Sequence, residues 1–522
     1  MMKVLLVQPQ IGYMDALRSA PGLPLGLLSV AAAVPDHLEV ELIDARLEPD
    51  LEGRLMRSLR QAPLLVGITC HSGPMIRSAL EISRLVKRHS KAPVIWGGVH
   101  PSLAPEVTLT EPSIDVCVRG EGEVTLVELI RALERRAPLD DVAGIAFRRD
   151  GQVVLTPDRS LLPADQWLEP RWDLVDVARY LPLYDGRPSL FYQASRGCPY
   201  RCSYCYNAPF NHQRFRHRPA EEVVASVTRL HQRYGFEDVY FVDDNFFVRL
   251  NWAEEVVRGI HGLGLTWQVQ GVDVASLLRM DGAYITRLGE VGCSRLTIGV
   301  ETGSDRLRRQ VGKQGSRQDV IEAIGRLRGT GIRVFTSFMV GFPQERRAEM
   351  QETVELALEL LDRYDFVRCS PVYCFTPYPG TASYEAAVAA GFQPPASLAA
   401  WSRIGSFDDF TWLDQAGNQE LDRDTFLGLN AVTLLIDDKV KDYSSSGILA
   451  LLAALYRPIA RFRARHLFFH AMPERRILRW LLDRQAPTHG RLPRPADPPL
   501  LASIRQTPCA SSWSNPTPPQ TR

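Results

Sequence analysis

The stretch that decides the fold is Ser195-Arg-Gly-Cys198-Pro-Tyr-Arg-Cys202-Ser-Tyr-Cys205-Tyr-Asn207, which holds three of the chain's nine cysteines. It directly follows the apolar run Leu190–Ala194, which predicts a strand, so the cysteines are expected on a loop at that strand's end. Three thiolates on one loop can each ligate one iron of a cubane cluster and leave the fourth iron without a protein ligand. Such an open iron can bind an exogenous chelate, as substrate binds at the open position of a catalytic zinc.

A zinc site is the alternative for these cysteines, with His212 or His217 as a further ligand. Structural zinc sites usually pair C-x2-C knuckles or close four ligands around the ion. The C-x3-C-x2-C spacing of this triplet does not follow that pattern. The spacing therefore favours an iron–sulfur cluster over zinc.

Six apolar runs with the character of parallel strands follow one another in the middle of the chain, and each gap is long enough for a helix. The predicted strands are Leu190–Ala194, Val239–Val242, Trp267–Gln270, Arg295–Val300, Arg333–Val340 and Phe366–Val372. Because a complete barrel needs about eight such units, the sequence predicts a partial barrel over residues 189–385. A mainly helical region is expected over 386–485. The Pro-, Ser- and Thr-rich tail, 486–522, is expected to be disordered.

The cysteine loop resembles the signature of the radical S-adenosylmethionine (SAM) superfamily, C-x3-C-x-aromatic-C, with Tyr204 as the aromatic residue. The resemblance implies a partial (βα)6 barrel, which agrees with the six predicted strands. It also implies that Cys198, Cys202 and Cys205 hold one [4Fe–4S] cluster, whose open iron chelates the methionine part of SAM. An electron from the cluster would then cleave SAM to methionine and a 5′-deoxyadenosyl radical.

Residues at the ends of later strands can be matched to the same family. Asp243 and Asp244 follow the second barrel strand, and the resemblance implies that one of them takes the ammonium group of SAM. Glu301, after the fourth strand, would accept hydrogen bonds from the ribose. Gly341, after the fifth strand, would let the backbone approach SAM closely. Lys313 resembles a recurrent lysine of the family. The alternative is that these residues only cap or turn the chain.

Residues 1–160 alternate strands with helical segments, which indicates an α/β domain with a doubly wound parallel, Rossmann-like sheet. The predicted strands are Lys3–Val7, Val40–Ile43, Leu64–Thr69, Val94–Trp96 and Ile114–Val118. A hairpin turned by Asp150-Gly151 follows, and residues 161–188 are expected to form a linker. No G-x-G-x-x-G follows the first strand, so dinucleotide binding is not expected. Ligands of such sheets bind beyond the carboxyl ends of the strands.

Glycines and polar residues gather at those strand ends in a pattern similar to the cobalamin-binding domain that precedes the barrel in one branch of the superfamily. The implied cobalamin contacts are Pro24, Leu25, Gly26, Asp44, Thr69, His71, Gly97, Gly98, His100, Gly120, Glu121, Gly122 and Glu123. The D-x-H-x-x-G motif of many cobalamin proteins is missing, so no histidine is expected on cobalt. His71 is the candidate ligand if one binds, and His100 is expected to orient a loop or contact the corrin. A flavodoxin-like module without cobalamin is the alternative for this domain.

Together these resemblances imply a cobalamin-dependent radical SAM enzyme. The leading hypothesis is methylation of an unreactive carbon or phosphorus centre of a small molecule, natural product or lipid, through methylcobalamin and the adenosyl radical. One alternative is an oxidative cyclase or rearrangement enzyme resembling the anaerobic porphyrin-ring cyclases. Another is a non-catalytic cobalamin and iron–sulfur sensor. An electron donor such as flavodoxin or ferredoxin is an expected partner.

Composition limits the partners and the location. Lys+Arg 61 against Asp+Glu 60 leaves a net charge of +1, so a nucleic-acid partner is not expected. No apolar run reaches the roughly 18 residues that span a bilayer, and the N-terminus is typical of a strand, so a cytoplasmic location is expected. The arginine-rich stretch from Arg457 to Arg484 contains Phe462, Phe468 and Trp480. It predicts either weak contact with a membrane surface or an apolar side packed on the barrel with the arginines in water.

Overall fold

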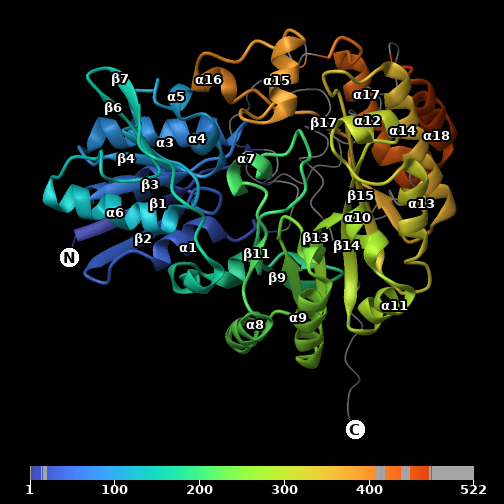
Figure 1. The fold of residues 1–522 in the computed structure, drawn as a ribbon, viewed down its shortest axis with the longest axis horizontal. Coiled ribbons are helices and arrows are strands. Elements are labelled where there is room, and N and C mark those ends of the chain that lie inside the picture. Colours follow the sequence, from blue (N-terminus) through green and yellow to red (C-terminus); the bar gives the residue numbers. More distant parts are fainter. Residues whose placement is uncertain are drawn as a thin grey trace.

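Two α/β domains lie side by side in the computed structural model, which describes residues 2–12, 15, 20–405, 413, 418–436, 447–469 and 472 (Figure 1). The N-terminal domain precedes the barrel domain, and the C-terminal helices continue from the barrel. The predicted tail, 486–522, and the end of the arginine-rich stretch with Trp480 lie outside the described residues.

The N-terminal domain is built on a seven-stranded sheet in the order β2-β1-β3-β4-β5-β6-β7. Its five parallel strands are β1 (Met2–Gln8), β2 (Leu38–Asp44), β3 (Leu65–Thr69), β4 (Val94–Gly97) and β5 (Val116–Val118). Helices cover both faces, so β1 is apolar on both sides. Leu5 and Val7 pack with α2 (Leu51–Leu59) and α3 (Met75–His89). Val4 and Leu6 pack with α1 (Leu25–Ala32) and α6 (Gly122–Arg135). The predicted doubly wound sheet is therefore confirmed.

The predicted hairpin is present as β6 (Ile145–Arg149) and β7 (Gln152–Leu155). Asp150 (φ +48°) and Gly151 (φ +79°) both adopt the left-handed conformation, which a two-residue type I′ turn requires. β6 pairs antiparallel with β5, so the hairpin extends the domain's sheet. The alternation pattern of the sequence did not predict that pairing.

The second domain is a partial barrel in the strand order β16-β15-β14-β13-β12-β9-β8, with β17 (Tyr373–Cys374) paired to β15. Its six parallel strands are β9 (Arg187–Tyr192), β12 (Asp238–Phe241), β13 (Thr266–Asp273), β14 (Cys293–Glu301), β15 (Arg333–Val340) and β16 (Val367–Cys369). β8 (Leu183–Tyr184) adds an antiparallel edge. The six predicted strands are confirmed, although β16 is shorter than expected because Pro371 has no N–H to donate to the ladder.

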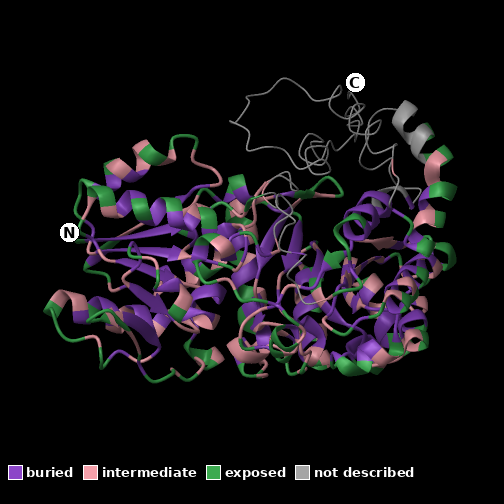
Figure 2. Cartoon of the chain, turned by 90° about the horizontal axis from the view of Figure 1, so that it is seen from above, coloured by how far each residue is buried: buried purple, intermediate pink, exposed green. Residues whose placement is uncertain are grey.

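Helices cover the outside of this half-barrel (Figure 1). They are α8 (Ala220–Tyr234), α9 (Leu250–Gly262), α10 (Val274–Arg279), α11 (Gly282–Glu290), α12 (Asp305–Gln310), α13 (Arg317–Gly325) and α14 (Arg347–Arg363). Figure 2 shows the strands of both domains in the buried colour and green along the outer faces of the helices. No helix in the described part of the chain is long and apolar enough to cross a membrane.

The C-terminal helices contact both domains. The backbone N–H of Ser383, in α15 (Ala382–Ala389), donates to the Ser203 carbonyl at 2.9 Å, between two of the motif cysteines. Trp401, at the end of α16 (Leu398–Trp401), packs against the His100 ring of the N-terminal domain with centroids 5.7 Å apart. α17 (Arg423–Ile436) and α18 (Gly447–His466) pack together, and α18 also contacts α14. The C-terminal region therefore helps to join the two domains.

Candidate functional site

The three motif cysteines lie on the loop between β10 (Ser195–Arg196) and α7 (Asn207–Asn211), which we call the cluster loop. β10 pairs antiparallel with β11 (Arg216–His217), so the loop is closed at its base. All three thiols are half-buried. Burial raises the pKa of Cys198 to about 11 and that of Cys205 to about 12. Iron binding must therefore displace protons from these thiols.

Two glycines let the protein hold the cluster loop from opposite sides. A Cβ at Gly197, whose φ is +86°, would lie 1.9 Å from the Arg214 carbonyl oxygen. A Cβ at Gly312 would lie 2.6 Å from the Arg201 carbonyl oxygen. No side chain fits at such distances, so both positions require glycine. The loop conformation is therefore fixed by backbone packing.

The acids after β12 also hold this loop. Both carboxylate oxygens of the buried Asp243 face it, accepting bonds from the Ser195 N–H and hydroxyl and, at 3.4 Å, from the Ala194 N–H. Burial raises the pKa of Asp243 to about 7, although these bonds oppose the shift. Asp244 is half-buried and accepts the Gly197 N–H at 2.8 Å. Asp244 also accepts from the Tyr206 hydroxyl at 3.3 Å, so both acids hold the protein's own groups, but Asp244 is the less buried of the two and therefore the more accessible to the expected ammonium group.

Asn245 brings an amide to the first cysteine. Its Nδ2 lies 3.8 Å from the Cys198 sulfur, and the Cys198 N–H donates to Asn207 at 3.1 Å. The Asn245 Oδ1 is buried without a hydrogen-bond partner. Hydrogen-bond donors to thiolate sulfur stabilise a cluster, and the Nδ2 group of Asn245 is such a donor. These features fit a [4Fe–4S] cluster on the loop.

The histidines of the zinc alternative do not complete a metal site. His212 is exposed, and the His217 ring packs against Trp252 in a tilted arrangement with centroids 4.7 Å apart. In the described ranges, no three His, Cys, Asp or Glu side chains converge as ligands of a single ion. A cubane cluster takes each thiolate on a different iron and needs no such convergence.

A buried charged group stands next to the cluster loop. The Lys313 Nζ donates to the Asp273 carboxylate at 2.7 Å, and both side chains are less than one-tenth exposed. Burial opposes the ammonium charge, but the carboxylates of Asp273 and Glu301 outweigh it and raise the pKa of Lys313. Burial raises the pKa of the Cys202 thiol, and the nearby Lys313 ammonium partly opposes that rise. A bound zwitterion such as the methionine part of SAM fits this pairing of charges.

The backbone of Glu301 has an unusual, left-handed conformation. Its φ is +69°, which non-glycine residues adopt only at a cost of about 1–2 kcal/mol. The β14–β15 register shifts between Gly299 and Glu301, as in a bulge that redirects a side chain. The Tyr204 hydroxyl bonds to its carboxylate, whose pKa is nevertheless raised, chiefly by burial. Strain of this kind is typical of functional sites, which supports the expected contact with the ribose.

Gly341 lies beside an aromatic group at the end of β15. Its φ is +86°, and its N–H donates to the buried Glu345, whose pKa burial raises to about 8. The neighbouring Phe342 ring meets the Tyr204 ring edge to face, with centroids 5.4 Å apart. The two predicted SAM-contacting positions Tyr204 and Gly341 are therefore brought close together.

The strand ends of the N-terminal domain leave space instead. A Cβ at Gly26 or Gly120 would meet nothing within 4 Å. The His71 side chain is exposed, yet burial lowers its pKa. Open space at these glycines fits a bulky ligand such as cobalamin.

Other predicted cobalamin residues point into the protein. The fully buried His100 lies 2.9 Å from the Ser72 hydroxyl through Nδ1, and burial lowers its pKa to about 3. A Cβ at Gly98 would lie 3.1 Å from the Thr69 hydroxyl oxygen. The Tyr180 hydroxyl donates to the buried Asp44 at 2.9 Å. The expectation that His100 orients a loop agrees with this geometry.

The loop after β5 binds the cluster loop directly. Glu121 accepts from Arg196 and from Arg216, each at 2.8 Å, and Glu123 accepts from Arg196 at 2.7 Å. The Arg196 guanidinium lies 4.6 Å from the centre of the Trp167 ring in the linker. We call these five residues the interdomain clamp. Because Arg196 is only two residues from Cys198, the clamp fixes the cluster loop against the N-terminal domain.

Comparisons with known proteins agree with this arrangement. Residues 192–357 match the model of the radical SAM superfamily, and residues 17–130 match that of the B12 binding domain. The chain is 31% identical over 396 residues to the "Uncharacterized methyltransferase PH0819" of Pyrococcus horikoshii, covering 74% of this chain and 83% of the relative. The chain belongs to the radical SAM enzymes that carry a B12-binding domain.

Two further likenesses extend the family assignment. The enzyme is 29% identical to an anaerobic magnesium-protoporphyrin IX monomethyl ester cyclase of Synechocystis, over 73% of this chain and 77% of the relative. It shares its fold with the radical SAM methyltransferase TsrM of Kitasatospora setae, with a TM-score of 0.62, 21% identity and coverage of 75% and 76%. The predicted family, fold class and cofactor set of [4Fe–4S] cluster, SAM and cobalamin are confirmed.

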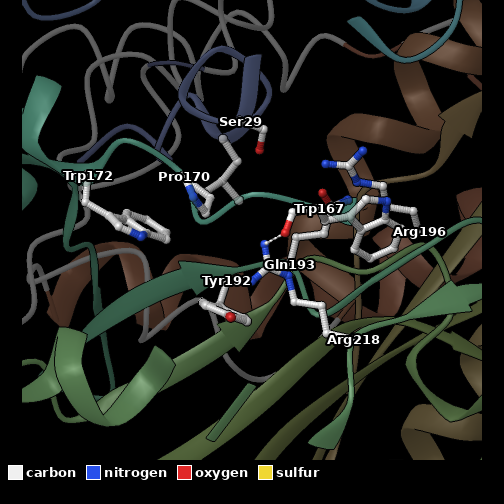
Figure 3. A pocket seen from close by; sticks show the side chains of 9 residues that line it. Ser29, Trp167, Pro170, Trp172, Tyr192, Gln193, Arg196 and Arg218 are labelled. Atoms are coloured by element: carbon white, nitrogen blue, oxygen red, sulfur yellow. Dashed lines mark hydrogen bonds between the residues drawn. The ribbon is translucent and has the colours of Figure 1, made fainter. Parts of the chain in front are cut away.

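A small pocket marks where the linker passes between the domains of this radical SAM enzyme (Figure 3). Its lining comes from α1, the linker, the end of β9 and the base of the cluster loop: Leu25, Ser29, Trp167, Pro170, Trp172, Tyr192, Gln193, Arg196 and Arg218. Its volume of about 20 Å³ holds about one water molecule. The pocket is therefore a packing gap at the interface and too small for a substrate.

Several residues of the site are not predicted by the sequence patterns. Asp273 was missed because Gly271 interrupts the apolar run, so the predicted strand stopped at Gln270. The strand nevertheless continues to Asp273. Glycine is required at position 271, because a Cβ there would lie 2.2 Å from the Asp243 carbonyl oxygen. The sequence signal that could have identified Asp273 is an acidic residue two positions after a glycine within a strand. The partners of Asn245 and Trp167 have no signal in the sequence.

Proposed function

We propose that this radical SAM enzyme methylates an unreactive carbon or phosphorus centre of a small molecule, natural product or lipid. The observation that carries the proposal is the interdomain clamp, in which Glu121 and Glu123 of the B12-binding domain bind Arg196 beside the cluster cysteines. A methyl carrier and a radical source must face the same substrate, so their domains need a fixed relative position. The relative named as a methyltransferase supports the same reading.

The residues of the chain would divide the work as follows. Cys198, Cys202 and Cys205 would hold the cluster, while Asp244 and the Lys313–Asp273 pair would hold the charged ends of the SAM methionine. Glu301 would bind the ribose. When bound, cobalamin supplies the methyl group, and the cluster supplies the electron that generates the adenosyl radical from SAM. A flavodoxin or ferredoxin would deliver that electron.

The test is anaerobic turnover with methyl-labelled SAM, a reductant and a candidate acceptor. Each product molecule consumes one SAM as methyl source and a second as radical source. S-adenosylhomocysteine and 5′-deoxyadenosine should therefore appear in comparable amounts, and the label should enter the product. Product formed without S-adenosylhomocysteine would contradict methyl transfer.

Oxidative cyclisation is the second candidate, because a cyclase is among the relatives that match most of the chain. It would yield 5′-deoxyadenosine with little S-adenosylhomocysteine and no label in the product. The same experiment therefore separates the two reactions.

A further inference from the structure

Helix α18 is apolar on two opposite sides. Ala460 and Ala464 are buried, and the helix packs on α14 and α17. The other side is exposed and carries four large apolar side chains: Leu451 (61% exposed), Leu455 (68%), Ile459 (50%) and Phe462 (57%). Their spacing of four, four and three residues places them in one stripe along the helix. The two interpretations drawn from the sequence concern Arg457 to Arg484, which overlaps the second half of α18, and neither placed apolar residues on both sides of the helix.

Single exposed apolar side chains are ordinary, but a continuous stripe marks a binding surface. Five of the large apolar side chains that are exposed within the described residues lie between Leu451 and Phe468. Figure 1 shows α18 at the edge of the molecule opposite the N-terminal domain. A partner on this stripe would therefore leave the interdomain clamp uncovered.

The charges on α18 indicate what the stripe binds. Between Gly447 and His466 the sequence has four arginines, Arg457, Arg461, Arg463 and Arg465, and no acidic residue. Arg461 is paired with Asp362 of α14, whereas Arg465 is exposed near the end of the stripe. A second copy of the chain docked through this helix about a two-fold axis would bring arginine towards arginine, since such interfaces use the same patch twice. An anionic lipid surface suits both the apolar stripe and the positive charge, because it accepts apolar side chains between headgroups and attracts arginines.

We propose that the exposed side of α18, with the adjoining Phe468, docks this enzyme on the surface of an anionic lipid bilayer. The helix lies in the plane of the surface, since no described helix is suited to crossing a membrane. Leu455 and Phe462 enter the interface, and Arg465, which is exposed, contacts the headgroups. This inference does not depend on which reaction the enzyme catalyses.

Co-sedimentation of the full-length enzyme with lipid vesicles tests the proposal. The enzyme should pellet with phosphatidylglycerol vesicles and remain in solution with phosphatidylcholine vesicles, and added salt should weaken the binding. The double variant Leu455→Glu with Phe462→Glu should bind at least about tenfold more weakly, because charged side chains cannot enter the interface. Leu168→Glu is the matched control, since Leu168 is 49% exposed in the linker, and it should bind like the wild type.

Equal binding by the double variant and the wild type would overturn the proposal. So would a dimer in sedimentation velocity that the double substitution dissociates, because the stripe would then bind a second copy. Binding that appears only after removal of residues 473–522 would assign the stripe to the chain's own tail. All substituted side chains are exposed, so matching melting temperatures should confirm that each variant is folded.

Discussion

Glycines near the two sites differ in what surrounds them. At the barrel edge, a Cβ at Gly197, Gly271 or Gly312 would lie 1.9, 2.2 or 2.6 Å from a backbone carbonyl oxygen. At the edge of the N-terminal sheet, a Cβ at Gly26 or Gly120 would meet nothing within 4 Å. These three barrel glycines pack the barrel's own loops, whereas Gly26 and Gly120 leave open space. Gly98 of the N-terminal domain is packed like the barrel glycines, because a Cβ there would lie 2.9 Å from the Cys70 carbonyl oxygen.

The charged side chains of the two domains also differ in their partners. Near the cluster loop, Lys313, Asp273 and Glu301 form a buried group suited to a small zwitterion. In the N-terminal domain, the acids Glu121 and Glu123 are engaged by Arg196 across the interface. The barrel site thus presents a buried charged group, whereas the acids of the N-terminal domain are paired across the domain interface. The interdomain clamp fixes the N-terminal domain relative to the cluster loop.

The largest effect is expected from Gly197→Ala. The added Cβ would clash with the Arg214 carbonyl, so the cluster loop must move, and the reconstituted protein should lose nearly all of its iron. Gly186→Ala is the matched control, because Gly186 also has a positive φ, +76°, but open space around it. It should cost only about 1 kcal/mol of stability and keep its iron, as measured by iron analysis and thermal melting. Full iron loading of the Gly197 variant would show that the loop tolerates displacement.

A smaller effect is expected from breaking the clamp. Glu121→Gln removes the charge that both Arg196 and Arg216 contact, while iron and cobalamin contents should stay normal. Methyl transfer from labelled SAM to the bound, reduced cobalamin should slow by about 100-fold, the loss that a shift of about an ångström can cause.

The control for the clamp is Glu254→Gln. Glu254 also contacts two arginines, Arg258 and Arg287, but on the outside of the barrel. Its methyl-transfer rate should match that of the wild type. Equal slowing in both variants would mean that the clamp only stabilises the fold.

A large side chain at Gly26 should weaken cobalamin binding without disturbing the fold. Gly26→Leu adds a side chain where the Cβ has no neighbour, so the melting temperature should stay the same or rise, since leucine favours a helix more than glycine. The affinity for hydroxocobalamin, followed by absorbance titration, should fall. Gly282→Leu is a matched change in the first turn of α11, again in open space, and should bind cobalamin normally.

The smallest effect concerns a buried acid at the barrel edge. Burial raises the pKa of Glu345 to about 8, so between its ordinary pKa of 4.5 and about 8 the folded protein holds a proton that the unfolded chain releases. This contribution therefore lowers stability as the pH rises through that window. In Glu345→Gln the melting temperature should fall less across the window than in the wild type.

Glu349, in the first turn of α14, has a pKa shift of the opposite sign. Arg306 and Ser304 outweigh burial and lower its pKa, so its stabilising contribution is lost as the pH falls through the folded pKa. Glu349→Gln should lose melting temperature relative to the wild type at neutral pH and regain it in acid. The same pH trend in both variants would contradict the assigned shifts.

Periodicity and strand-end motifs sufficed to predict most of the fold. The strand β15 was predicted at its observed bounds, because Arg333–Val340 is an uninterrupted β-rich run between helical segments. β13 was cut short at Gln270, because a glycine inside a strand weakens the local signal and only the approach of Asp243 explains it. Local patterns thus give the strands, whereas close approach between strands depends on the tertiary fold.

The site was predicted less completely for the same reason. Cys198, Cys202 and Cys205 share one short motif, so they could be found from their spacing. The pairing of Lys313 with Asp273 joins residues 40 positions apart and has no local signature. Glu121 resembled a ligand contact in sequence, but its carboxylate binds arginines of the other domain. A carboxylate's partner is decided by packing between domains, which a motif does not contain.

We expect a cluster site in the barrel and a separate cobalamin site in the N-terminal domain. The most direct test is the metal content of three full-length proteins after anaerobic reconstitution with iron, sulfide and hydroxocobalamin. The wild type should hold about four irons, as one [4Fe–4S] cluster requires, together with stoichiometric cobalt. Cys202→Ala should lose iron and keep cobalt, while Gly26→Leu should lose cobalt and keep iron. Loss of both metals in either variant, or of neither, would contradict two separate sites that differ in how they hold their ligands.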